Sequence, residues 1–147
     1  MTLVVDTVLV PVDGSEASAD AAEYAIAVAE RYDADLHVLY VVGETVARGM
    51  EAGDIDETDV ADESQLFVAD VAAMADDPDR VESSMAYGFS TVRKTRHPGS
   101  VVLDAAEDLS ADFLVIPRES MSGEQGDVLE KAAEYVLLYA SQPVLSV

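Results

Sequence analysis

Cysteine is absent from this chain of 147 residues, and lysine is nearly so, with only Lys94 and Lys131. The lack of thiols excludes disulfides, thiolate metal sites, iron–sulfur clusters and cysteine nucleophiles, and it favours a reducing compartment. No apolar run reaches the roughly 18 residues of a membrane-spanning helix, and residues 1–6 have neither the basic start nor the long apolar stretch of a signal peptide. We therefore expect a cytoplasmic protein that does not insert into membranes. The length suits one domain over residues 1–147.

Positive charge is scarce as well, because 8 basic residues face 30 acidic ones and the formal net charge is −22. So much like charge destabilises a compact state at ordinary ionic strength, whereas concentrated salt screens it. This composition predicts a halophilic protein in a salt-rich cytoplasm. An acidic surface that recruits a basic partner protein is the alternative. Binding to DNA or RNA is not expected, since phosphate contact needs a basic face.

The hydrophobic pattern predicts alternating strands and helices. The predicted strands are continuously apolar rather than alternating, which is typical of a parallel sheet covered on both faces. We therefore predict an α/β fold, a doubly wound five-stranded parallel sheet with helices on both faces, which binds ligands at the carboxyl ends of its strands. The predicted strands cover about residues 7–12, 35–42, 81–88, 112–117 and 143–147, and the predicted helices cover 15–34, 62–76, 99–111 and 126–142. Ser15 and Ser100 are the predicted N-caps of the first and third helices.

Two stretches depart from this regular alternation. Residues 44–82 hold thirteen acids and two arginines, and the part at about 43–62 is expected to be a mobile acidic loop or a fraying helix start. The stretch "STVRKTRHP" places Arg93, Lys94 and Arg96 within four residues. They either pair with surface acids of this chain or of a second subunit, or they contact a bound anion or a partner's carboxylates. The second hypothesis gives a reason to cluster scarce positive charge near the ligand-binding end of the sheet.

Three stretches resemble the universal stress protein family: "VLVPVDGSEASADAAEYAIAVAERYDADLHVLYVV", "VVLDAAEDLSADFLVIP" and "AEYVLLYASQPVLSV". The resemblance spans nearly the whole chain and is weakest over residues 44–97. It implies the fold shared with the adenine-nucleotide alpha-hydrolase-like proteins. It also implies a homodimer built through the last strand, here Val144 to Val147.

Many members of that family bind ATP through a motif after the fourth strand, G-x2-G-x9-G-S/T. Its positions fall here on Pro117, Ser120, Glu130 and Lys131, so none of the three glycines is present. Proline has no N–H to donate to a phosphate. A carboxylate at Glu130, about 5 Å from a phosphate at an effective dielectric near 20, would repel it by roughly 3 kcal/mol. ATP binding in the family's way is therefore not expected.

The nucleoside half of the family's site is better retained. Asp13 matches the acid that faces the nucleoside, and Val41 matches the strand-end residue whose backbone meets adenine. With Arg118 and Ser120 these residues are the candidate cofactor-binding set, for a nucleotide other than ATP or for another anion. Alternatively, the loop has become a helix-capping turn in which Asp127 and Glu130 form a capping box.

Catalysis and metal binding find little support in the chain. Asp13, Ser15 and His37 are residue types that a hydrolase uses, but no Gly-x-Ser-x-Gly elbow occurs and His37 is expected to be a packed strand residue. The acidic stretch lacks the spacing of a calcium loop. We expect a dimeric, non-enzymatic regulatory protein with no catalytic residues and no metal, and a binder of an anionic small molecule is the alternative.

Overall fold

One five-stranded sheet organises the chain, and the computed structural model describes residues 3–87, 97–118 and 132–147. All neighbouring strands are parallel, and their order is β3-β2-β1-β4-β5. The predicted doubly wound α/β fold is therefore confirmed. The strands are β1 (Thr7–Val12), β2 (Asp35–Val42), β3 (Val81–Tyr87), β4 (Phe113–Ile116) and β5 (Val144–Ser146).

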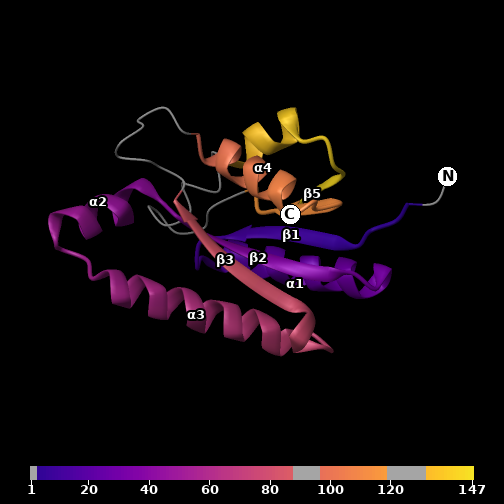
Figure 1. Ribbon diagram of the computed structural model, residues 1–147, viewed down its shortest axis with the longest axis horizontal. Helices are drawn as coiled ribbons and strands as arrows, with labels where there is room; N and C mark the ends of the chain where they lie inside the picture. Colours follow the sequence, from indigo (N-terminus) through magenta and orange to yellow (C-terminus); the bar gives the residue numbers. More distant parts are fainter. Residues whose placement is uncertain (1–2, 88–96, 119–131) are drawn as a thin grey trace.

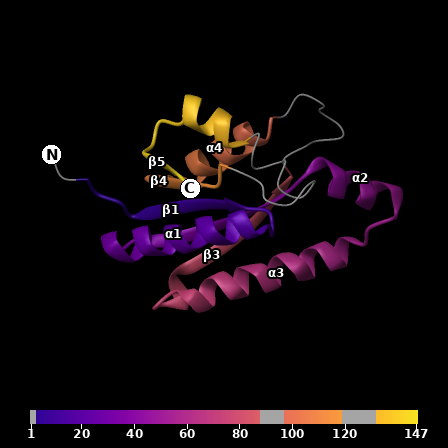
Figure 2. The ribbon, with the colours of Figure 1, turned by 180° about the vertical axis from the view of Figure 1, so that it is seen from behind.

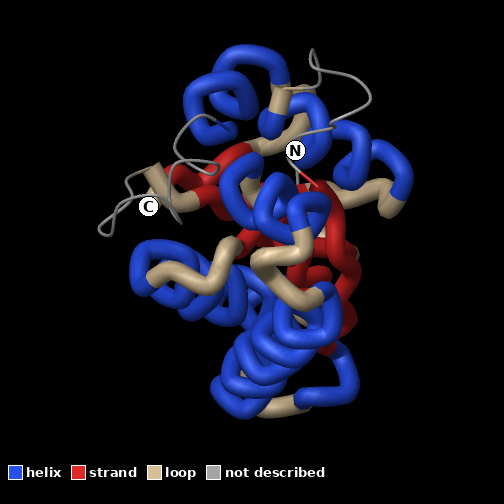
Figure 3. The backbone as a smooth tube through the Cα atoms, turned by 90° about the vertical axis from the view of Figure 1, so that its left-hand side faces the viewer, coloured by secondary structure: helices blue, strands red, loops and turns tan. Residues whose placement is uncertain are grey.

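Helices cover both faces of this sheet, as Figures 1 and 2 show from opposite sides. One apolar layer joins the sheet to α1 (Glu16–Tyr32), α2 (Glu44–Ala52) and α3 (Glu57–Met74). The other joins it to α4 (Pro98–Asp108) and to the helical residues 132–139. Seen end-on in Figure 3, blue helices lie on both sides of the red strands. The apolar runs of β1, β2 and β4 follow from this arrangement, because both faces of these strands are covered. The edge strand β3 is largely exposed and carries polar residues.

Strand β1 shows how the two layers share one strand. Val8, Val10 and Val12 belong to the layer on the α1 side, whereas Leu9 belongs to the layer on the α4 side, and all four are fully buried. On the α1 side small residues allow the helix to approach the sheet closely, since Ala21, Ala22, Ala25 and Ala29 are buried.

The acidic segment is more helical than the sequence analysis expected. Residues 44–52 form α2, and α3 begins at Glu57 rather than near residue 62. Asp56 caps α3 by accepting a hydrogen bond from the Thr58 N–H at 2.9 Å. Gly53 ends α2 with a φ of 81°, which a glycine adopts without strain. Mobility of residues 43–62 stays a prediction.

The start of α4 corrects a second expectation. Its N-cap is His97 and not Ser100, because the His97 Nδ1 accepts a hydrogen bond from the Gly99 N–H at 3.0 Å and Pro98 is the first helical residue. The His97 ring also stacks on Tyr135 with centroids 4.6 Å apart. Gly99 fits beneath this stack, since a Cβ there would lie 2.4 Å from the Tyr135 Cβ. Tertiary packing therefore fixes where α4 begins.

We expect His97→Ala to lower the free energy of unfolding by about 0.5–2 kcal/mol, because it removes the cap and the ring stack together. Ser100→Ala is the matched control and should leave stability nearly unchanged. Both are measured by urea unfolding in concentrated potassium chloride. If Ser100→Ala is the more destabilising variant, the observed cap is wrong. His97→Asn should recover part of the loss, since asparagine is a good N-cap without the ring.

None of the helices in the described ranges is long and apolar enough to cross a membrane.

Candidate functional site

The turn after β1 is held by a closed set of hydrogen bonds. The Asp13 Oδ1 accepts from the Ser15 N–H at 3.0 Å, and the Ser15 Oγ accepts from the Ser18 N–H at 3.2 Å. The Ser18 Oγ donates to the Ser15 carbonyl and accepts from the Asp13 N–H. Ser15 is therefore the N-cap of α1, as predicted, and Asp13 is fixed by the same turn.

Gly14 allows this turn to press against β2. Its φ is 84°, and a Cβ at this position would lie 2.9 Å from the Tyr40 hydroxyl oxygen. The Tyr40 hydroxyl donates to the Asp13 carbonyl at 3.4 Å, and the Tyr40 ring meets Phe67 edge-on with centroids 6.2 Å apart. Burial raises the pKa of Tyr40, so this hydroxyl stays protonated and keeps its donor. The turn is thus held against β2 by close packing and by the hydrogen bond from Tyr40.

Asp13 has one carboxylate oxygen without a donor. The residue is only 6% exposed, yet within the described parts of the chain its Oδ2 is buried and has no hydrogen-bond partner. Buried polar atoms are normally paired, so an unpaired carboxylate oxygen calls for an explanation. This atom can accept a hydrogen bond from a hydroxyl or amine group of a ligand.

Asp13 and Val41 each follow the last registered pair between β1 and β2. That pair is Val12 with Tyr40, so Asp13 and Val41 are the next residues along their chains. The ladder between β2 and β3 continues to Val42, two residues further. The Val41 side chain is 1% exposed and belongs to the layer on the α4 side. Only its backbone is therefore placed to meet a ligand.

A proline shortens the ladder at the point where the strand order reverses. The Asp112 N–H donates to the Thr7 carbonyl, so odd-numbered residues of β1 direct their backbone groups toward β4. Pro11 has the same parity and lacks an N–H, and the registered pairs between β1 and β4 end at Leu9 with Leu114. Doubly wound sheets bind ligands in this crevice, outside the carboxyl ends of the strands.

The first two residues of the loop after β4 are held against the sheet by burial and by a backbone hydrogen bond. Pro117 is buried, and the Arg118 N–H donates to the Val147 carbonyl at 2.9 Å. The Arg118 side chain is exposed, and no contact of it with Asp13 or Val41 is recorded in the described part of the chain. Several predicted site residues lie outside the described residues: Ser120, Asp127, Glu130, Lys131, Arg93, Lys94 and Arg96.

His37 does not join Asp13 and Ser15. It is 7% exposed and pairs in register with Leu9, four residues before Asp13. Its Nε2 lies 2.7 Å from the Ser84 Oγ, so β3 satisfies the ring. Burial lowers the pKa of His37, which keeps it neutral. The prediction of a packed strand histidine is confirmed, and the three side chains do not form a catalytic triad.

Comparison with known proteins extends these observations. The model of the universal stress protein family matches residues 5–147. Universal stress protein MJ0531 of Methanocaldococcus jannaschii is 28% identical over 144 residues, which cover 95% of this chain and 80% of that protein. Universal stress protein UspA from Lactobacillus plantarum has a similar structure, with a TM-score of 0.70 and 22% identity over 99% of each chain. A universal stress protein solved in complex with cAMP gives a TM-score of 0.64 and 22% identity over 97% of each chain.

Proposed function

This chain belongs to the universal stress protein family, and on that premise we propose that it is a dimeric, non-enzymatic regulator of the stress response that does not hold ATP as the family's ATP-binding members do. The loop after β4 carries this proposal. A phosphate cradle needs free backbone N–H groups. Pro117 has none, and the Arg118 N–H is already bonded to the Val147 carbonyl. The first two residues of the loop therefore offer no donor to a phosphate chain.

A second candidate function is the binding of a nucleotide with a short phosphate chain. The buried, unpaired Asp13 Oδ2 favours it, because a ribose hydroxyl is a suitable donor for this atom. Val41, one residue after the registered partner of Val12, is the second residue of this proposed site. A structural relative was solved with cAMP, which has a single phosphate group. Such a ligand makes less use of a glycine loop than ATP does.

The nature of any retained ligand tests both candidates. Protein purified in concentrated potassium chloride is denatured, and the released small molecules are measured by absorbance and mass spectrometry. Retained ATP contradicts the first candidate, whereas a retained nucleoside monophosphate supports the second. Calorimetry with ATP and magnesium, and then with AMP, gives the same comparison on added ligand. Asp13→Asn should weaken only a ligand that donates to the Oδ2, so it identifies the site.

The dimer is proposed to form through the free edge of β5. Nothing lies beyond β5 in the strand order of the described sheet. Hydrogen bonds from the Leu114 N–H to Pro143 and from the Val147 N–H to Ile116 show that the odd-numbered residues face β4. Val144 and Ser146 therefore direct their N–H and carbonyl groups outward. An edge of this kind can pair with its twofold copy.

We expect Ser146→Pro to convert the dimer into a monomer, because it removes an outward N–H without removing a hydrogen bond to β4. Light scattering at micromolar concentration gives the mass. Ser146→Ala is the matched control, since it keeps the N–H and should stay dimeric. A proline variant that is as dimeric as the alanine variant places the interface elsewhere, and a monomeric parent protein contradicts the dimer altogether.

A further inference from the structure

A pocket of ≈ 300 Å³ opens at the amino-terminal end of the sheet, opposite the end that carries Asp13. It lies between the last turns of α1, the segment from α3 to β3, and the first residues of β2. Its floor is apolar, and Ile26, Ala29, Ala34 and Leu36 are each between 3% and 6% exposed. Carboxylates surround the mouth, so the pocket joins an apolar interior to a strongly acidic opening.

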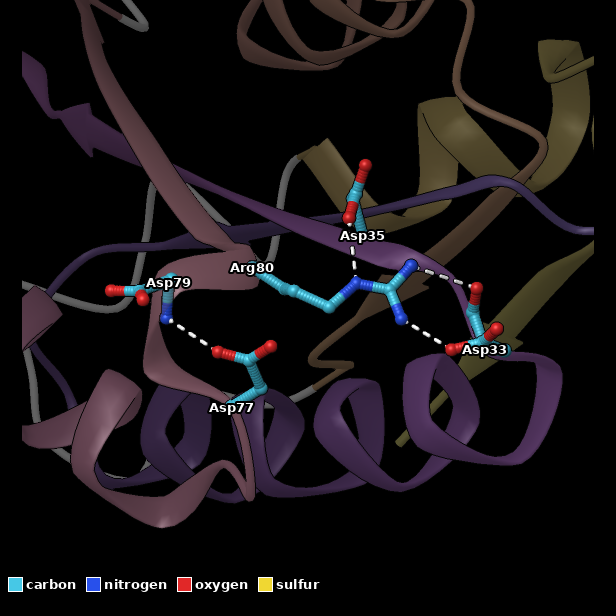
Figure 4. A network of polar contacts seen from close by, with 5 residues as sticks. All are labelled: Asp33, Asp35, Asp77, Asp79 and Arg80. Atoms are coloured by element: carbon cyan, nitrogen blue, oxygen red, sulfur yellow. Dashed lines mark hydrogen bonds and ion pairs between the residues drawn. The ribbon is translucent and has the colours of Figure 1, made fainter.

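On one side of the mouth, Arg80 forms ion pairs with two aspartates. Figure 4 shows Arg80 between two aspartates: its Nε donates to the Asp35 Oδ1 at 2.9 Å, and its Nη2 donates to the Asp33 carbonyl at 2.8 Å. The Nη1 pairs with the Asp33 carboxylate. The Asp77 carboxylate accepts a hydrogen bond from the uncharged Asp79 N–H. Arg80 is thus engaged by Asp33 and Asp35, and in the described part of the chain no ion pair joins it to Glu30 or Asp76.

The other side of the mouth holds two acids in mutual contact. A side-chain hydrogen bond with Asp76 raises the pKa of Glu30. Both residues line the pocket. Two neighbouring carboxylates repel each other when both are charged, and a cation placed between them relieves that repulsion.

The helix ends near the pocket add to its negative electrostatic potential. α1 ends at Tyr32 and α3 ends at Met74, and both ends lie next to pocket residues. The carboxyl end of a helix carries a partial negative charge. In a doubly wound fold the helices run opposite to the strands, so the amino-terminal end of the sheet is its electronegative end. The two helix ends and the acids therefore both favour a positively charged ligand.

We propose that this pocket binds a small organic cation, an ammonium or guanidinium group on a short aliphatic stem. The charged group lies between Glu30 and Asp76, and the stem covers the apolar floor. An inorganic cation makes no use of the floor, and no group of three or more His, Asp or Glu side chains in the described part of the chain is placed to hold a metal ion. A volume at the lower end of the range for small-molecule sites limits the ligand to a few carbons beyond its charged group.

The test uses n-pentylammonium chloride as the probe and n-pentanol as its neutral isostere, with saturation-transfer NMR in about 0.5 M potassium chloride. We expect saturable binding of the ammonium compound and binding of the alcohol about tenfold weaker or less. Glu30→Gln combined with Asp76→Asn should weaken ammonium binding by about tenfold or more. The matched control is Glu107→Gln with Asp108→Asn, which removes two exposed acids from the last turn of α4, away from the pocket.

The control decides between a built site and general attraction to an acidic protein. Equal weakening in both double variants overturns the proposal, as does the absence of saturable binding up to about 100 mM. Ala75→Leu provides a second arm, because it places a larger side chain in the lining of the pocket without changing charge. It should abolish pentylammonium binding, and full binding by this variant also overturns the proposal. Since the pocket lies at the opposite end of the sheet from Asp13, neither outcome depends on nucleotide binding.

Discussion

In about 0.1 M potassium chloride we expect this protein to be unfolded or loosened, and we expect its melting temperature to rise as the salt is increased into the molar range. The reason is the excess of acids, 30 against 8 basic residues, of which at most a few can be paired. The screening length falls from about 10 Å at 0.1 M to about 3 Å at 1 M, so repulsion between neighbouring carboxylates is largely removed in concentrated salt.

Helix α3 shows where this repulsion acts. It has 18 residues and no lysine or arginine, and Asp59 and Glu63 stand four residues apart on its exposed surface. Like charges at this spacing destabilise a helix by about 0.2–0.5 kcal/mol per pair. The acids of α3 are Glu57, Asp59, Asp62, Glu63 and Asp70.

Two variants of α3 turn the salt prediction into a matched comparison. Asp62→Asn with Glu63→Gln removes the two acids that follow Asp59 by three and four residues and keeps Asp59 in the first turn, where the helix dipole favours an acid. This variant should raise the melting temperature at low salt and flatten its dependence on potassium chloride. Gln65→Glu, at an exposed position of the same helix, should do the opposite. Sucrose stabilises proteins without screening charge and serves as the solvent control. A melting temperature that does not change with salt contradicts the halophilic interpretation.

Most of the sheet could be predicted from the sequence because β1, β2 and β4 are short and largely apolar, whereas β3 gives a weaker signal. The start of α1 could also be predicted, since Ser15 is a common capping residue and follows a buried strand closely. The start of α4 could not be predicted from the sequence, because histidine is an unusual cap. Its ring position depends on Tyr135, which is 38 residues away in the sequence. The early start of α3 could not be predicted for another reason. Its N-cap is Asp56, and this residue stands among many other acids in the sequence.

The candidate site could be predicted only in part. The resemblance pointed to Asp13 and Val41, which directly follow the last registered pair of β1 and β2, Val12 with Tyr40. The unpaired Asp13 Oδ2 depends on how the turn uses its hydrogen bonds, which no sequence pattern states. The pocket at the opposite end was missed entirely, because its walls come from three separate segments and its acids looked like ordinary solvated surface.

The last prediction concerns the loop after β4. We expect Pro117→Gly combined with Ser120→Gly and Glu130→Gly to create or strengthen binding of ATP with magnesium by at least about 100-fold. Each amide that becomes free to bond a phosphate oxygen contributes about 1.5–3 kcal/mol. Without screening, a Glu130 carboxylate about 5 Å from a phosphate at an effective dielectric near 20 would repel it by roughly 3 kcal/mol. Its removal therefore adds to the gain, by less in concentrated salt.

Calorimetry in molar potassium chloride measures this gain, and Glu130→Gln alone separates charge from backbone freedom. If the single variant accounts for all of the gain, repulsion and not the missing amides excludes ATP from the parent protein. If the triple variant gains nothing, Asp13 and Val41 do not frame an adenosine pocket, and the unpaired Oδ2 has to be explained by another ligand. A gain that Asp13→Asn reverses in the triple variant locates the nucleoside at the turn after β1, because only a ligand that donates to the carboxylate of Asp13 responds to both changes.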